Sequence, residues 1–126
     1  LDKILAEISA GELVDKITIL EIKKAKINDF NKLKDINNEL LSLNETFQNV
    51  IDKDKIRDEI TNLREINLKL WDIETNKRNA EKTQKFDKDF IKLARSVYKT
   101  NDERAKIKLK INQILGSNIK EVKSHY

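Results

Sequence analysis

The apolar residues in the middle of the chain recur at intervals of three and four over two long segments, 32–50 and 53–73. They are Leu33, Ile36, Leu40, Leu43, Phe47 and Val50 in the first segment, and Ile56, Ile60, Leu63, Ile66, Leu70 and Ile73 in the second. This period places them on one face of a helix, whereas a strand would need alternation. The 126 residues include two glycines and no proline, which excludes a turn-rich all-β protein. We expect an all-α fold, a bundle of three to five helices dominated by long antiparallel helices.

The apolar residues in 32–50 form a seam along one face of the predicted helix, and this seam is regular enough for a coiled coil. One face of an antiparallel hairpin or bundle explains it equally well. Asp29 or Asn31 is expected to cap the start of this helix, since both side chains accept hydrogen bonds from a free backbone N–H.

The helix predicted over about 10–27 is the one around which we expect the others to pack. Ser9 and Glu12 stand three apart before an apolar run, as in a capping box. Leu13, Ile17 and Leu20 then form one apolar stripe, with Ile19 and Ile22 beside it. A helix with two apolar faces is expected to contact neighbours on more than one side.

Two segments leave alternatives open. After Ile73, Ala80 is the single apolar residue up to position 85, so the third helix either continues into solvent or a polar cleft, or gives way to a loop. In the last helix the apolar stripe is interrupted at Thr100 and Arg104. We favour one long helix there over a break at 100–103, with Gly116 ending it.

The length fits a single helical domain, 1–126, with an N-terminal arm at 1–8 and a C-terminal tail at 117–126. Within the tail, Ile119 and Val122 are expected to pack back onto the bundle.

Composition excludes several classes of function. Cysteine is absent and the single histidine is His125, which removes thiolate sites and a Ser-His-Asp triad, so we predict no metal and no cofactor. No apolar run is long enough to cross a bilayer, and we expect a cytoplasmic protein with no membrane partner. The 26 basic and 22 acidic residues alternate along most of the chain, so we do not expect nucleic-acid binding despite the net charge of +4.

Three polar clusters interrupt the apolar stripes, one on each of three predicted helices. They are Glu12, Asp15 and Lys16; Trp71, Asp72, Glu74 and Arg78; and Arg95, Tyr98, Asn101, Asp102 and Arg104. Buried ion pairs that join the helices would explain them. A shared pocket for a carboxylate or phosphate would explain them as well, because Arg and Lys donors suit such anions. Either interpretation predicts that these side chains converge in space.

Three runs of sequence resemble the signatures of a bacterial domain of unknown function. The runs are GELVDKITILEIK at 11–23, LWDIE at 70–74 and LARSVYKTND at 93–102, and the ending Lys123-Ser124 before Tyr126 also fits, with His125 as an insertion. The resemblance spans most of the chain. It implies a short helical protein, often encoded near glycosyltransferase genes, with no established activity and no assigned catalytic residues.

The chain carries no catalytic motif, so we favour a non-enzymatic helical-bundle protein that acts by association, with itself as a dimer or with a partner protein. The alternative is binding of a small anionic metabolite or sugar phosphate in a polar pocket between helices.

Overall fold

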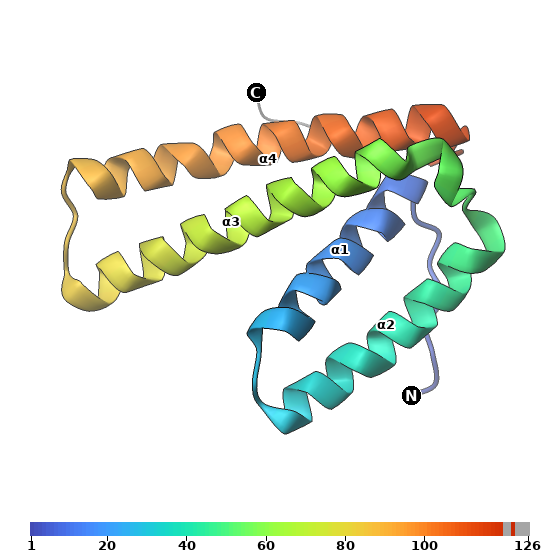
Figure 1. Ribbon diagram of the computed structural model, residues 1–126, viewed down its shortest axis with the longest axis horizontal. Helices are drawn as coiled ribbons and strands as arrows, with labels where there is room; N and C mark the ends of the chain where they lie inside the picture. Colours follow the sequence, from blue (N-terminus) through green and yellow to red (C-terminus); the bar gives the residue numbers. More distant parts are fainter. Residues whose placement is uncertain (120–121, 123–126) are drawn as a thin grey trace.

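A computed structural model describes residues 1–119 and 122, and these fold into four α-helices and one turn of 3-10 helix, with no strand (Figure 1). The elements are α1 (Ala10–Lys26), α2 (Phe30–Val50), η1 (Lys53–Ile56), α3 (Arg57–Thr83) and α4 (Lys88–Leu115). The predicted all-α bundle of long helices is therefore confirmed.

The helix ends follow local side-chain chemistry. Ser9 Oγ accepts from the Glu12 N–H at 3.1 Å and caps α1, and Asp29 Oδ1 accepts from the Lys32 N–H at 3.0 Å and caps α2. Of the two cap residues predicted for α2, Asp29 is the one used. Gly116 adopts a left-handed φ of +65° and ends α4, as predicted.

For the third and the last helix the sequence left open whether each was long or interrupted, and both are long and continuous. α3 continues through the polar segment to Thr83, where Gln84 in the left-handed region ends it. α4 is a single helix, and Thr100 at the interruption of its stripe is buried inside the bundle.

The four helices form two antiparallel hairpins, α1–α2 and α3–α4, and α1 packs against all three of the others (Figure 1). The α3–α4 hairpin is much longer than α1. Its closed end, around the turn 84–87, extends beyond α1 and α2.

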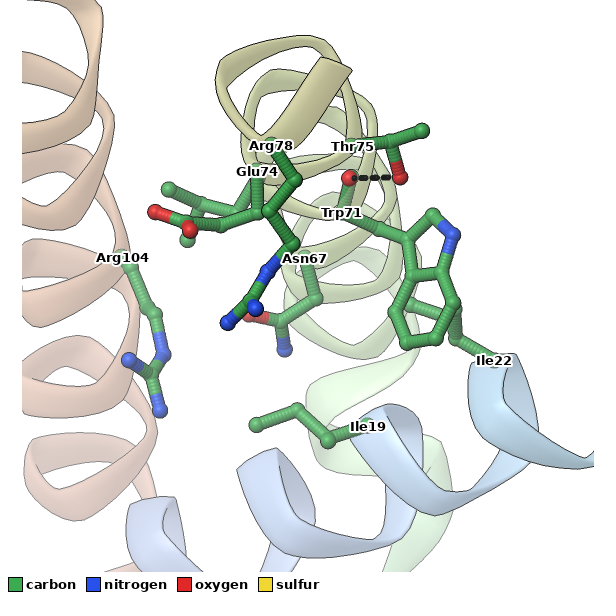
Figure 2. Close-up of a pocket in the computed structure, with 9 residues that line it drawn as sticks. Ile19, Ile22, Asn67, Trp71, Glu74, Thr75, Arg78 and Arg104 are labelled. Atoms are coloured by element: carbon green, nitrogen blue, oxygen red, sulfur yellow. Dashed lines mark hydrogen bonds between the residues drawn. The ribbon is translucent and has the colours of Figure 1, made fainter. Parts of the chain in front are cut away.

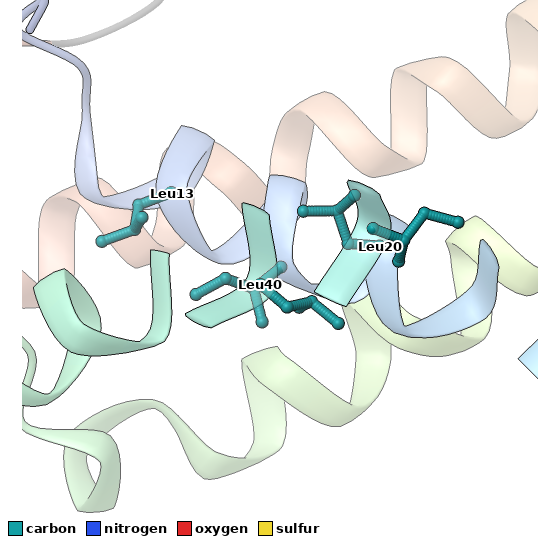
Figure 3. Close-up of a cluster of buried hydrophobic side chains, with 5 residues drawn as sticks. Leu13, Leu20 and Leu40 are labelled. Atoms are coloured by element: carbon teal, nitrogen blue, oxygen red, sulfur yellow. The ribbon is translucent and has the colours of Figure 1, made fainter. Parts of the chain in front are cut away.

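Two apolar clusters hold this arrangement together, one on each side of α1. On one side Leu13, Ile17 and Leu20 pack on Ile36 and Leu40 of α2 (Figure 3). The seam of α2 is thus covered by α1, so the antiparallel hairpin explains it and a separate coiled coil is not needed.

On the other side of α1, Val14 packs with η1, α3 and α4. Ile56, Leu63 and Ile111 in this cluster are fully buried. The expectation that α1 contacts neighbours on more than one side is confirmed. Its second side contributes Val14 to this cluster, whereas Ile19 and Ile22, the residues expected there, belong to neither cluster.

The two ends of the chain pack less than the helices do. Residues 1–8 have no regular structure, and Leu1, Ile4 and Leu5 are almost fully exposed. Val122 is also exposed, so the expected packing of the tail is wrong for this residue. Positions 120–121 and 123–126 of the predicted tail lie outside the described residues, as does the ending of the resemblance.

Candidate functional site

Asp15 lies at the centre of a buried polar network between α1, α3 and α4. Its side chain is 1% exposed, and both carboxylate oxygens are bound by Arg104 of α4: Nε donates to Oδ1 at 2.9 Å, and Nη2 pairs with Oδ2. Asn67 Nδ2 of α3 also donates to Oδ1 at 2.9 Å. A buried carboxylate persists only when it is paired and hydrogen-bonded, and here two helices supply the partners.

A second ion pair stands beside the first. Lys108 Nζ of α4 lies 2.7 Å from Glu12 Oε2 and 3.8 Å from Asp15 Oδ2. Two carboxylates of α1 thus face two cations of α4, and the group is electrically balanced. Asn67 Nδ2 also donates to Thr18 Oγ1 at 2.9 Å, which joins α3 to the same turns of α1.

The start of α1 approaches the backbone of α4 closely, and a glycine permits it. A Cβ built on Gly11 would stand 2.5 Å from the carbonyl oxygen of Lys108. The Gly11 N–H, which the first turn of a helix leaves free, donates instead to Asn112 Oδ1 at 2.7 Å. The network therefore depends on a residue without a side chain at position 11.

A cavity of about 470 Å³ opens next to this network, between α1 and α3, with Arg104 of α4 at its edge. Its lining consists of Ile19, Ile22, Asn67, Leu70, Trp71, Glu74, Thr75, Arg78 and Arg104. Figure 2 shows Arg78 reaching from α3 across Asn67, while the indole of Trp71 lies on the other side of the cavity near Ile22. Apolar side chains and a few polar ones share this lining, which is typical of sites for small molecules.

Among the cations of this region, Arg78 is the one without a partner in the described part of the chain. Arg104 is bound to Asp15, and Lys108 to Glu12. Lys77 Nζ lies 3.3 Å from Glu74 Oε1. The Arg78 side chain is exposed and makes no hydrogen bond or ion pair with a described residue, so its guanidinium is available at the mouth of the cavity.

The structure brings part of the predicted site together. Trp71, Glu74, Arg78 and Arg104 line the cavity. Behind it, Glu12 and Asp15 belong to the buried network, and Asn101 Oδ1 accepts from Arg104 Nη1 at 3.5 Å. Asp102 is half-buried on α4 next to Asn101.

Four of the predicted residues do not join this group. Lys16 and Asp72 are exposed on their helices, and Lys16 pairs only loosely with Glu12 at 3.9 Å. Tyr98 is exposed, and Arg95 lines a separate groove on α4. Arg95 and Arg104 are nine positions apart, which at 3.6 residues per turn places them on opposite sides of the helix. The expected convergence of Arg95 and Tyr98 with Asp15 is therefore not seen.

Sequence reasoning missed Asn67 and the roles of Gly11 and Asn112. For Asn67 a signal was present, because Leu63 and Leu70 can be joined at helical spacing through either position 66 or position 67. The apolar Ile66 was the natural choice, but it is half-buried whereas Asn67 is buried. Asn67, a polar residue at a position that could belong to the apolar seam, was thus the sequence signal for the buried network.

Comparison with protein families gives a match to a family of unknown function, DUF6165, over residues 4–126. The chain belongs to this family. The match covers all four helices, the buried network and the cavity, in agreement with the resemblance to a domain of unknown function. Comparisons with curated proteins and with solved structures give no match. None of the helices in the described part of this DUF6165 protein combines the length and apolarity that a bilayer crossing requires.

Proposed function

We propose that this DUF6165 protein binds a small anion with an apolar or planar portion, such as a sugar phosphate, in the cavity between α1 and α3. The observation that carries the proposal is Arg78, a cation at the cavity mouth that no described carboxylate neutralises. The neighbouring charges are already paired: Arg104 with Asp15, and Lys77 with Glu74, the carboxylate of the cavity lining. A planar guanidinium binds carboxylate or phosphate through two parallel hydrogen bonds.

The rest of the cavity suits the non-ionic portion of such a ligand. Ile19 and Ile22 of α1 and Leu70 and Trp71 of α3 form the apolar lining. An indole face packs well against a planar ring or against the C–H face of a sugar. Asn67 of α3 donates to both Asp15 and Thr18 of α1, which fixes the two helices relative to each other, so the walls of the cavity would be formed before a ligand enters.

Trp71 supplies a direct test, because it is the only tryptophan of the chain and lines the cavity. Sugar phosphates, their uncharged parent sugars and inorganic phosphate would be titrated while Trp71 fluorescence and the thermal unfolding midpoint are followed. We expect at least one phosphorylated sugar to change the fluorescence and raise the midpoint, because a ligand that binds only the folded state stabilises it. The parent sugar should do neither at the same concentration.

A pair of variants makes the test specific. Arg78→Gln removes the free guanidinium and should weaken phosphate-dependent binding at least tenfold. Arg95→Gln removes an exposed arginine of the separate groove on α4 and should leave binding unchanged. Equal binding by the wild type and by Arg78→Gln would contradict the proposal.

Self-association is a second candidate function, and the apolar arm favours it. The exposed Leu1, Ile4 and Leu5 offer apolar surface that a second copy could cover. We expect sedimentation to show a dimer that Ile4→Ser with Leu5→Ser dissociates. A wild-type chain that stays monomeric at high micromolar concentration would contradict this function.

A further inference from the structure

The helix α4 carries a second apolar stripe, on the side that its neighbours leave uncovered. Its inner stripe includes Ile107 and Ile111, which pack with Leu63 of α3. The outer stripe contains Ile91, Ala94, Tyr98, Ala105 and Leu109, again at intervals typical of a helix face. Ile91, Tyr98 and Leu109 are 57%, 54% and 41% exposed. Side chains of this kind on one face form a surface suited to packing against another helix.

Cations line one edge of this outer stripe. They are Lys88, Lys92, Arg95, Lys99, Lys106 and Lys110, spaced four, three, four, seven and four residues apart. Asp102 and Glu103 fall in the gap of seven, so the edge is continuous only from Lys88 to Lys99. Lys110 Nζ lies 3.7 Å from Glu59 Oε2. The other five make no ion pair with any residue in 1–119 or with residue 122. Four of them, with Ile91 and Ser96, line a groove of about 410 Å³ on this face.

The positive charge of the molecule is concentrated at the closed end of the α3–α4 hairpin, around the turn 84–87. Residues 75–100 contain eight Lys and Arg and three Asp and Glu, a net +5, while the whole chain carries +4. This segment is thus an exception to the alternation of basic and acidic residues along most of the chain. An uncompensated cationic edge selects an acidic partner and speeds its approach.

We propose that the outer face of α4 docks an acidic amphipathic helix of a partner protein. The apolar stripe would pack on the seam of the partner helix, and the cationic edge would face its Glu and Asp residues. Ala94 and Ala105 have small side chains that project little from the helix, so that the backbone of a partner helix can approach α4 closely.

The same face fits other occupants less well. Asp102 and Asn101 interrupt the middle of the stripe, which disfavours insertion into a lipid surface, where such groups lose their hydration. The same face of a second copy of this chain would bring the same cations, and α4 carries only three carboxylates, Asp89, Asp102 and Glu103, to meet them. The charge pattern therefore points to an acidic helix from a different protein.

The proposal can be tested with defined peptides on the full chain. The probe is a synthetic helix of about five turns, the length of the outer stripe, with a leucine seam and Glu along the flanks. A matched peptide carries Lys at the same flank positions. We expect the wild type to bind the Glu peptide at least tenfold more tightly than the Lys peptide, by fluorescence anisotropy of labelled peptide. Substitution of K92E, R95E and K99E together should reverse that preference.

Two further variants separate this face from general charge attraction. The triple variant K32E, K34E and K69E makes the same charge change at exposed positions of α2 and α3, and it should keep the wild-type preference. Ile91→Ser combined with Tyr98→Ser leaves every charge in place and should weaken Glu-peptide binding severalfold.

Three outcomes would overturn the proposal. One is equal binding of both peptides by the wild type. Another is an equal loss of the preference for the Glu peptide in the two triple variants, which would show a general charge attraction without a defined binding site. The third is absence of peptide binding together with capture by phosphatidylserine vesicles or by single-stranded RNA that K92E, R95E and K99E abolish, which would assign the face to lipid or nucleic acid.

Discussion

Two arginines of α4, Arg104 and Arg95, stand two and a half helical turns apart and occupy opposite environments. Arg104 binds the buried carboxylate of Asp15 and joins α4 to α1. Arg95 lies in an open groove among lysines and makes no described ion pair. The difference arises from α1, which covers one side of α4 near its C-terminal end and leaves the outer side uncovered. The residue type alone does not reveal which arginine is structural.

The comparison extends to the two ends of the α3–α4 hairpin. Near Leu63 and Ile111 the hairpin is packed against α1 and η1, and both residues are fully buried. At the closed end, Phe86 and Phe90 make an edge-to-face contact with ring centroids 5.2 Å apart, and Phe86 remains exposed. We expect stability to be concentrated at the packed end, and the exposed end to be free for recognition.

The largest effect is expected when the buried network loses its central carboxylate. Asp15→Ala leaves Arg104 and Lys108 near each other without the charge that both face. Breaking a buried pair from one side costs about 3–5 kcal/mol. Urea unfolding should show a loss of this size.

A surface pair provides the control for Asp15→Ala. Asp54 pairs with Arg57 at 2.5 Å, but both side chains are largely exposed. Asp54→Ala should therefore change the free energy of unfolding only slightly. Similar losses in the two variants would remove the distinction between the packed network and the surface.

Matched truncations of two leucines compare the ends of the hairpin directly. Leu63 is 0% exposed at the packed end, and Leu63→Ala should cost about 2–5 kcal/mol because it opens a cavity. Leu93 is half-buried toward the closed end, and Leu93→Ala should cost about 1 kcal/mol. Equal losses in urea unfolding would show that the exposed end is packed as firmly as the base.

The close approach of α1 to α4 gives the third test. Gly11→Ala places a methyl group 2.5 Å from the backbone oxygen of Lys108, so one helix must shift. Overpacking of this kind costs about 1–3 kcal/mol. An unchanged unfolding midpoint would show that the start of α1 can move away from α4 freely.

Gly116 supplies a comparison by a different mechanism. A Cβ there meets nothing within 4 Å, but the backbone has a φ of +65°. Gly116→Ala should therefore cost about 1 kcal/mol through backbone strain alone. It should leave the Asp15 network intact, which would be visible as unchanged chemical shifts around Asn67.

The fold followed from the sequence because its signals are local. The apolar spacing in 32–50 and 53–73 predicts helices by itself, and Ser9, Asp29 and Gly116 mark helix ends through bonds to their own neighbours. One long α4 could also be expected, because a polar interruption of a stripe does not break a helix.

The site could be predicted only in part because it depends on which faces meet. The sequence predicts both Arg104 and Arg95 as site residues, and only the packing of α1 against α4 distinguishes the buried one from the exposed one. Asn67 was missed because its partners, Asp15 and Thr18, are 52 and 49 positions away in the chain. Such pairings follow from the three-dimensional arrangement and leave little trace in local spacing.

The smallest effect is expected at Arg95, and it gives the clearest check on the comparison of the two arginines. Arg95→Gln removes a charge from the exposed groove, where neighbouring cations repel it and no described carboxylate binds it. The free energy of unfolding should change by less than about 0.5 kcal/mol. Arg104→Gln, the matched change on the opposite side of α4, should cost several times more because Asp15 stays buried without its main partner. If Arg95→Gln destabilised the fold as much as Arg104→Gln, the outer face of α4 would be part of the structural core, and neither the groove nor the cationic edge would be available to a partner.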